Sequence, residues 1–203
     1  MPHGIEPAVE VPAARRDEVR RRLGLPEPYV LHVGTVQARK NVDLVVAGVR
    51  ELRRRGLPHR AVVVGRRGWL AERAVAELGR DDTAPWLEHV DSADLPAVYA
   101  GAAAFVSPSA YEGFGFAVAD ALAAGVPTVI ADVSSLPELC GDAAVRLPVL
   151  SAGAVADALD ALLRDPVRRR ELAAEGRASS RRSRVALSTP TSSRSCSRRR
   201  RPT

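Results

Sequence analysis

The stretch AAFVSPSAYEGFGFAVADALAAGVPTVIA, residues 103–131, contains in order a strand, a loop, a helix and a second strand. Residues 103–106 and 127–131 are short apolar runs of strand length, and residues 115–124 between them have helical spacing. Gly125 follows the helical run directly, where a residue that tolerates positive φ ends a helix at little cost. The stretch therefore predicts a β-α-β unit with two parallel strands.

The same alternation extends in both directions, from Tyr29 to about Leu147. We expect further strands at 29–33, 60–64 and 86–90, and a weaker one at 143–147. Further helices are expected at 42–55, 69–78 and 94–100, with Gly56, Gly79 and Gly101 as end signals, in a segment from Pro12 to Gly24, and in a pair at 151–164 and 166–176. The predicted fold class is α/β: a single Rossmann-like domain with a parallel sheet and helices on both faces.

Length and composition are those of a globular protein with one domain. Of the 203 residues, 46% are apolar and 27% charged. The sequence contains no apolar run of membrane-span length and no signal-peptide pattern at its amino terminus, so we expect a cytoplasmic protein. Cys140 and Cys196 lack metal-ligand spacing, and we expect both to be free thiols without a metal site.

Basic charge is concentrated at the carboxyl end. Residues 177–203 contain nine arginines and no acidic residue, which leaves residues 1–176 with a net charge of −3 against +6 for the whole chain. Because this segment is also poor in apolar residues, we expect a disordered Arg/Ser-rich tail. The expected organisation is a crossing segment and first helix at 1–28, the domain at 29–176 and the tail at 177–203.

Two loops at the carboxyl ends of strands carry the residues that suit a ligand. The loop GTVQARKN, 34–41, combines Gly34 with the paired cations Arg39 and Lys40, and Asn41 is a candidate cap for the next helix. Lys40 is the only lysine in the protein. This combination suits a diphosphate, although a solvated charge pair at a helix start is the simpler alternative.

The second loop, 107–125, combines glycines with carboxylates. Gly113 and Gly115 flank Phe114 just before a helix, which predicts exposed backbone amides that can hold an anion. Glu112 precedes these glycines, and Asp120 follows Glu112 by eight residues within the helix. Two carboxylates at this separation can accept hydrogen bonds from hydroxyl groups several ångströms apart, as in a sugar site.

The order of these motifs resembles the large family of retaining glycosyltransferases with two Rossmann-like domains, family four in the usual classification. The resemblance rests on five segments at family spacing, which are PHGIEP (2–7), VGTVQARKN (33–41), VVVG (62–65), SPSAYEGFGFAVADALAAGVP (107–127) and SSLPEL (134–139). It implies the donor-binding, C-terminal half of a GT-B fold and transfer of a hexose, with mannose as a guess by similarity.

The resemblance also implies roles for individual residues. Arg39 and Lys40 would bind the donor diphosphate, Glu112 would bind hydroxyls of the transferred sugar, and the backbone of 113–115 would contact sugar and phosphate. Where the family has a second glutamate for the ribose hydroxyls, this sequence has Asp120, whose shorter side chain predicts weaker ribose binding. The family needs no metal or other cofactor, and it uses no protein nucleophile.

The resemblance also implies a missing partner. In the family an amino-terminal domain binds the acceptor, whereas here Met1 stands directly before the crossing segment, and the tail looks like a frameshifted reading of GC-rich DNA. We therefore expect a truncated chain that is inactive alone. The alternatives are a noncatalytic sugar-nucleotide-binding module, a nonfunctional gene fragment, a nucleic-acid-binding protein acting through its tail, and an epimerase of the same architecture.

Several residues allow a purely structural interpretation. His32, within a strand, fits a packed core position better than a ligand contact. Trp69 and Trp86 fit packing better than base stacking, and Phe114 and Phe116 fit anchors of the glycine loop. Arg66 and Arg67 fit a solvated pair better than a donor contact.

Overall fold

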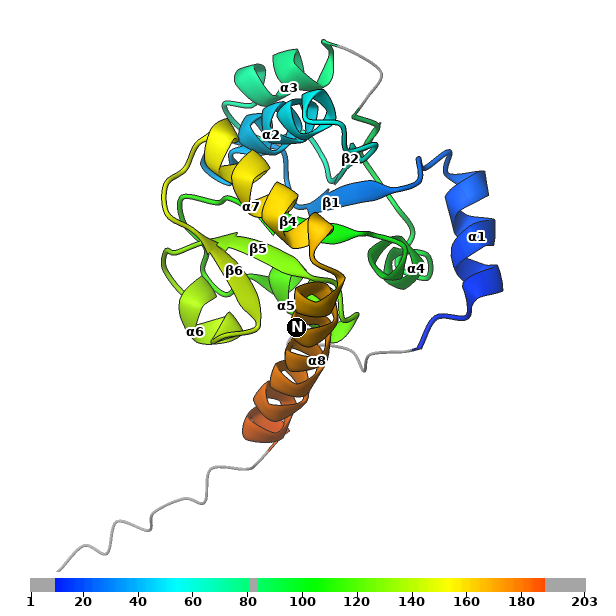
Figure 1. The fold of residues 1–203 in the computed structure, drawn as a ribbon, viewed down its shortest axis with the longest axis vertical. Helices are drawn as coiled ribbons and strands as arrows, with labels where there is room; N and C mark the ends of the chain where they lie inside the picture. Colours follow the sequence, from blue (N-terminus) through cyan, green and yellow to red (C-terminus); the bar gives the residue numbers. More distant parts are fainter. Residues whose placement is uncertain (1–9, 81–83, 189–203) are drawn as a thin grey trace, which may run out of the picture.

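The computed structural model describes residues 10–80 and 84–188, and its centre is a sheet of six parallel strands (Figure 1). The strand order is β3-β2-β1-β4-β5-β6. The strands are β1 (Tyr29–Val33), β2 (Arg60–Val64), β3 (Trp86–Leu87), β4 (Ala104–Ser107), β5 (Thr128–Ala131) and β6 (Ala144–Leu147). All six expected strands are present, and the predicted α/β fold class is confirmed. The strand expected at 86–90 is shorter, ending at Leu87.

Helices cover both faces of the sheet because its strands are apolar on both sides. In β1, Val30 packs into one buried cluster while Leu31 packs into the other. The first cluster lies under α2 (Val42–Arg54), α3 (Glu72–Leu78) and α7 (Ala152–Arg164). The second lies under α1 (Ala13–Arg22), α4 (Leu95–Ala100), α5 (Phe116–Ala123) and α6 (Leu136–Cys140).

Three local expectations need correction. The helix expected from Trp69 begins at Glu72, because Leu70 adopts a left-handed backbone with φ of 51°. The short helix α6 was not predicted from the sequence. Gly101 ends α4 with an ordinary φ of −86°, and its requirement is spatial, because a Cβ there would lie 2.7 Å from the Tyr29 hydroxyl.

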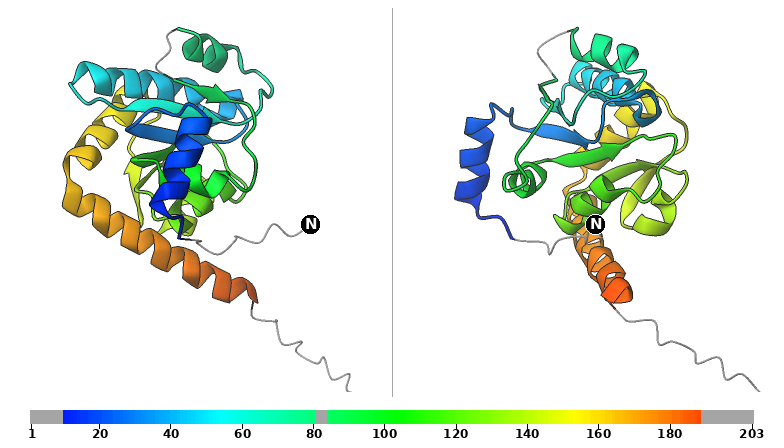
Figure 2. Two further views of the ribbon diagram at one scale, coloured as in Figure 1. Left: turned by 90° about the vertical axis from the view of Figure 1, so that its right-hand side faces the viewer. Right: turned by 180° about the vertical axis from the view of Figure 1, so that it is seen from behind.

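The final helix, α8 (Pro166–Ser188), is longer than expected and corrects the predicted boundary of the tail. The sequence predicted a helix that ends at Gly176 and disorder from 177 onward, whereas 177–188 continue the helix. Packing accounts for the continuation as far as Ser180, because α8 contacts α5: Gly176 lies against Leu122, and Ser180 is buried. Figure 2 shows α8 turning away from α7 along the domain. Residues 189–203 of the predicted tail lie outside the described residues.

The strand order places a topological switch point between β1 and β4. From β1 the chain adds β2 and β3 on one side, and from β4 it adds β5 and β6 on the other. The loops that leave β1 and β4 therefore start side by side at the carboxyl edge of the sheet, where open α/β folds bind ligands. No helix within 10–80 or 84–188 is long and apolar enough to cross a membrane.

Candidate functional site

The loop after β1 folds the Lys40 side chain back over Gly34. Residues Ala38–Lys40 form the 3-10 turn η1, which reverses the chain before α2. A Cβ placed on Gly34 would lie 3.6 Å from both Cε and Nζ of Lys40. The Lys40 side chain is only 12% exposed, whereas that of Arg39 is 44% exposed. The two predicted cations thus sit at the carboxyl end of β1, one largely covered and one open to solvent.

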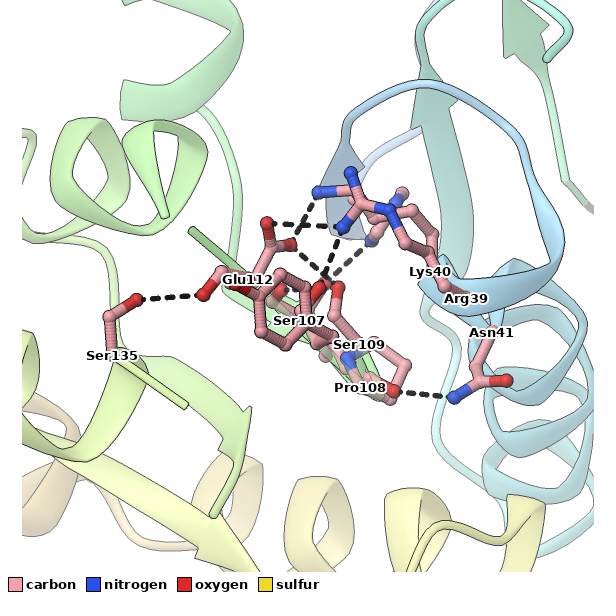
Figure 3. A network of polar contacts seen from close by, with 11 residues as sticks. Arg39, Lys40, Asn41, Ser107, Pro108, Ser109, Glu112 and Ser135 are labelled. Atoms are coloured by element: carbon pink, nitrogen blue, oxygen red, sulfur yellow. Dashed lines mark hydrogen bonds and ion pairs between the residues drawn. The ribbon is translucent and has the colours of Figure 1, made fainter. Parts of the chain in front are cut away.

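Glu112, from the loop after β4, forms ion pairs with both Arg39 and Lys40 (Figure 3). Its carboxylate accepts a short hydrogen bond from Lys40 and lies 3.5 Å from Nη1 of Arg39. Ser109 donates to the same carboxylate at 2.8 Å. The Glu112 side chain is 8% exposed. Residues 72 positions apart in the sequence therefore form one ion-pair cluster across the switch point.

The charge of Glu112 is maintained by this cluster. Burial of the carboxyl would raise its pKa, but the hydrogen bonds from Lys40 and Ser109 and the charges of Lys40 and Arg39 together lower it. The carboxylate is therefore ionised at neutral pH and held in one orientation. The cluster presents an anionic acceptor next to two cationic donors.

Backbone and amide contacts fix the two loops to each other. The Asn41 side chain donates from Nδ2 to the carbonyl of Pro108 at 2.8 Å, and the Ala110 amide donates to the carbonyl of Arg39 at 2.8 Å. Arg39 also donates to the carbonyl of Tyr111 at 2.6 Å. The expectation that Asn41 caps α2 is wrong, because its side chain makes no cap hydrogen bond and its φ is 50°. This residue connects the loops instead.

The glycine turn lies at the start of α5, as predicted. Gly115 is the N-cap with φ of 87°, and a Cβ there would lie 2.7 Å from Cδ2 of Leu136, so both backbone and space require glycine. Apart from its two chain neighbours, no residue that the structure describes has an atom within 4 Å of the Cβ position of Gly113. Phe114 and Phe116 pack on each other with ring centroids 4.7 Å apart, but they remain 36% and 50% exposed.

Asp120 lies on α5, one helical turn beyond Phe116, and is partly exposed. Burial raises the pKa of the Tyr99 hydroxyl, and the negative charge of Asp120 raises it further. Asp120 belongs to the same loop-helix segment as Glu112.

His32 is buried beneath the site, with 1% of its surface exposed. Its Nδ1 donates to the carbonyl of Val106 at 2.9 Å, so the ring bridges β1 and β4. Nε2 has no hydrogen-bond partner among the described residues, and it lies 3.6 Å from the Cβ position of Gly34. Burial, aided by the charge of Lys40, lowers the pKa of His32 to about 4. The imidazole is thus neutral at pH 7.

Two serines contribute to the site without having been predicted. Ser109 bonds the Glu112 carboxylate, and Ser135 donates to the Glu112 carbonyl at 3.2 Å, which attaches the start of α6 to the loop. Both belong to segments, SPS and SSLPEL, that the sequence comparison of motifs had singled out. The sequence did contain a signal for Ser109, because a hydroxyl side chain stands three residues before the predicted carboxylate of Glu112.

The remaining polar and aromatic candidates lie around the edge of the site. Arg66 and Arg67 are exposed, and their backbone runs beside the first loop through a bridge between Val36 and Arg67. Trp86 packs partly into the core and donates to the Gly65 carbonyl at 2.8 Å. The packing expected for Trp69 is wrong, because 87% of this residue is exposed. Across 10–80 and 84–188, no three His, Cys, Asp or Glu side chains cluster closely enough to hold a metal ion.

Comparison with known proteins gives consistent relatives. Residues 15–179 match the family described as Glycosyl transferases group 1. O-antigen chain mannosyltransferase B of Escherichia coli is 37% identical over 123 residues, which are 57% of this chain and 31% of that protein. Sucrose-phosphate synthase of Thermosynechococcus elongatus has 29% identity and a TM-score of 0.69, covering 82% of this chain and 44% of that one.

A third similarity concerns the fold alone. HepE of Anabaena, in a structure with UDP-glucose, has a TM-score of 0.73 at 19% identity, covering 87% of this chain and 50% of that one. The chain thus spans half or less of each of these three proteins. The predicted C-terminal half of a glycosyltransferase fold agrees with these structures, and the family match extends over most of the chain. This protein belongs to the group 1 glycosyltransferases.

Proposed function

We propose that this chain binds a nucleotide diphosphate sugar as the donor for hexosyl transfer. The observation that carries the proposal is the Glu112 carboxylate shared by Lys40 and Arg39 at the switch point. A diphosphate needs cationic donors, and a sugar needs a fixed acceptor for its hydroxyls. The cluster offers both within one site. Mannose is the first sugar to test, because the E. coli relative is named a mannosyltransferase.

Each residue has a specific part in the proposed binding. Arg39 and Lys40 contact the diphosphate, Glu112 accepts from a sugar hydroxyl, and the amides of 113–115 contact sugar and phosphate. Asp120 accepts from the ribose hydroxyls with a reach about one methylene shorter than a glutamate. Its position on the partly exposed face of α5 suits this contact.

The proposed chemistry is transfer with retention at the anomeric carbon. Negative charge develops on the departing diphosphate, and Arg39 and Lys40 stabilise it in place of a metal ion. The acceptor hydroxyl attacks the anomeric carbon from the face of the departing diphosphate as the bond to that diphosphate breaks, and the diphosphate takes the hydroxyl proton. The protein therefore supplies neither a base nor a nucleophile. The acceptor contacts belong to the additional length that the relatives have, and we expect the chain alone to bind donor without transferring sugar.

Calorimetric titration with GDP-mannose, UDP-glucose and ADP-glucose tests donor binding. Replacing Arg39 or Glu112 by alanine should weaken binding of the preferred donor by about 1.5–3 kcal/mol, the range for hydrogen bonds to charged groups. Matched controls are Arg21→Ala and Glu175→Ala, which remove exposed charges on α1 and α8. Equal affinities for the site variants and the controls would refute the site.

A transfer assay separates an enzyme from a binding module. The chain is mixed with the amino-terminal half of a relative, and release of nucleoside diphosphate is followed in the presence of acceptor. Donor binding without turnover in this mixture would favour the noncatalytic sugar-nucleotide-binding module.

A further inference from the structure

The Nε2 atom of His32 is a buried acceptor that the proposed donor contacts leave unused. The ring is 1% exposed, and Nε2 has no partner among the described residues. Leaving such an atom unpaired in a protein interior is unfavourable, whereas an apolar side chain at this position would avoid the penalty. An unpaired buried acceptor beneath a candidate site therefore indicates that Nε2 gains a hydrogen-bond partner in another state of the protein.

Lys40 supplies a candidate for that partner, because its ammonium and Nε2 have a common neighbour in Gly34. The Cβ position of Gly34 lies 3.6 Å from Nε2 of His32 and also 3.6 Å from Nζ of Lys40. A lysine ammonium carries three donor hydrogens, and the hydrogen bond recorded for this one is to Glu112. The unused acceptor and a donor with spare hydrogens thus face the same small space beside Gly34.

The tautomer of His32 restricts what Nε2 can bind. The carbonyl of Val106 can only accept, so Nδ1 carries the proton and Nε2 presents a lone pair. With a pKa of about 4 the ring is neutral at pH 7. Phosphate oxygens without a proton are repelled by this lone pair, whereas an ammonium is attracted to it.

We propose that His32 is a positioning residue for Lys40. When a bound sugar nucleotide engages Glu112, Nε2 of His32 accepts a hydrogen bond from the Lys40 ammonium. This inference rests on the proposed function, because the sugar must compete with Lys40 for the Glu112 carboxylate. Lys40 is a point charge on a flexible four-carbon stem, and losing Glu112, its anionic partner among the described residues, would remove the contact that fixes its position. The hydrogen bond to His32 keeps the ammonium beside Gly34, where the diphosphate needs it.

A double-mutant cycle tests whether His32 acts through Lys40. Calorimetry with GDP-mannose, UDP-glucose and ADP-glucose selects the best donor, whose affinity is then measured for His32→Val, Lys40→Met and the double variant. We expect His32→Val to weaken binding about tenfold with Lys40 present and less than about twofold in the Lys40→Met background. His32→Gln, whose amide can donate to Val106 and accept from Lys40, should restore most of the affinity.

The outcomes separate this inference from the proposed function. Undiminished affinity of His32→Val, or the same loss in both backgrounds, would overturn the positioning role. If the unchanged protein bound none of the three donors, the proposed function would be refuted instead. Nitrogen NMR of the unchanged protein gives a second measurement if His32→Val does not fold. The Nε2 resonance should move toward a hydrogen-bonded value when donor is added, and its constancy at saturating donor would overturn the inference.

Discussion

Replacing Lys40 by methionine should destabilise the fold measurably even without a ligand. The substitution keeps most of the side-chain volume but removes the charged donor from a Glu112 carboxylate that is 8% exposed. A hydrogen bond to a charged group contributes about 1.5–3 kcal/mol. Arg39, 3.5 Å from the carboxylate and 44% exposed, partly compensates, so we expect a loss of about 2 kcal/mol. For a domain of this size the melting temperature should fall by roughly 4–8 °C.

The pH dependence of this loss identifies its cause. In the unchanged protein the folded-state pKa of Glu112 is lowered, so the carboxylate stabilises the fold above its ordinary pKa, and this contribution is lost as pH falls through the folded-state value. In Lys40→Met the burial of the carboxyl raises the pKa relative to the unchanged protein. The difference in stability between the two proteins should therefore be largest at pH 7 and shrink below about pH 4.5.

Urea denaturation measures the difference between these proteins. The fluorescence of Trp86, partly buried and hydrogen-bonded to Gly65, reports unfolding. Titrations at several pH values between about 7 and about 3 are compared for the unchanged protein, Lys40→Met and the matched control Arg21→Met on α1. A stability difference that stays constant over this range would show that Lys40 contributes through packing alone, and it would refute the electrostatic reasoning.

Three further outcomes are expected. Asp120→Glu should tighten donor binding about threefold to tenfold in calorimetry by restoring reach to the ribose, and unchanged affinity would contradict that role. Gly115→Ala should cost about 1–3 kcal/mol in urea denaturation because of its φ of 87° and the close Leu136 side chain. Gly113→Ala, with no atom within 4 Å of the Cβ position, should stay within about 0.5 kcal/mol, and equal losses at the two glycines would be inconsistent with this steric account. A chain ending at Gly176 should melt at a lower temperature than one ending at Ser188, because it lacks the part of α8 that contains buried Ser180; coincident melting curves would show that this part adds nothing to stability.

Local rules predicted the elements and the two loops of the candidate site, because both depend on short-range patterns. Strands and helices follow from apolar spacing, and the two loops follow from the rule that ligands bind at the carboxyl ends of parallel strands. The same local rules failed for Asn41. Its position favours a helix cap, but the carbonyl of Pro108 from a distant loop offers the better partner.

Composition failed at residues 177–188 for a related reason. Few apolar side chains predict disorder, yet α8 continues through these residues after approaching α5 closely at Gly176, which lies against Leu122. Composition reports how much apolar surface a segment has and says nothing about how well its shape fits a neighbour. A close fit of this kind becomes visible only when both helices are placed.

The site itself adds what no local pattern contains, which is the sharing of charge between the two loops. Arg39 and Lys40 were expected to bind the anion of a ligand, and in the structure both already form ion pairs with the Glu112 carboxylate. On the proposed function, an incoming diphosphate would replace an existing partner of the cations, while the sugar hydroxyl would bind the carboxylate. Because each ligand group satisfies the protein group that the other displaces, a molecule with both groups should bind better than either fragment. The binding free energies of a nucleoside diphosphate and of a free hexose, measured separately, should add up to less than the binding free energy of the sugar nucleotide.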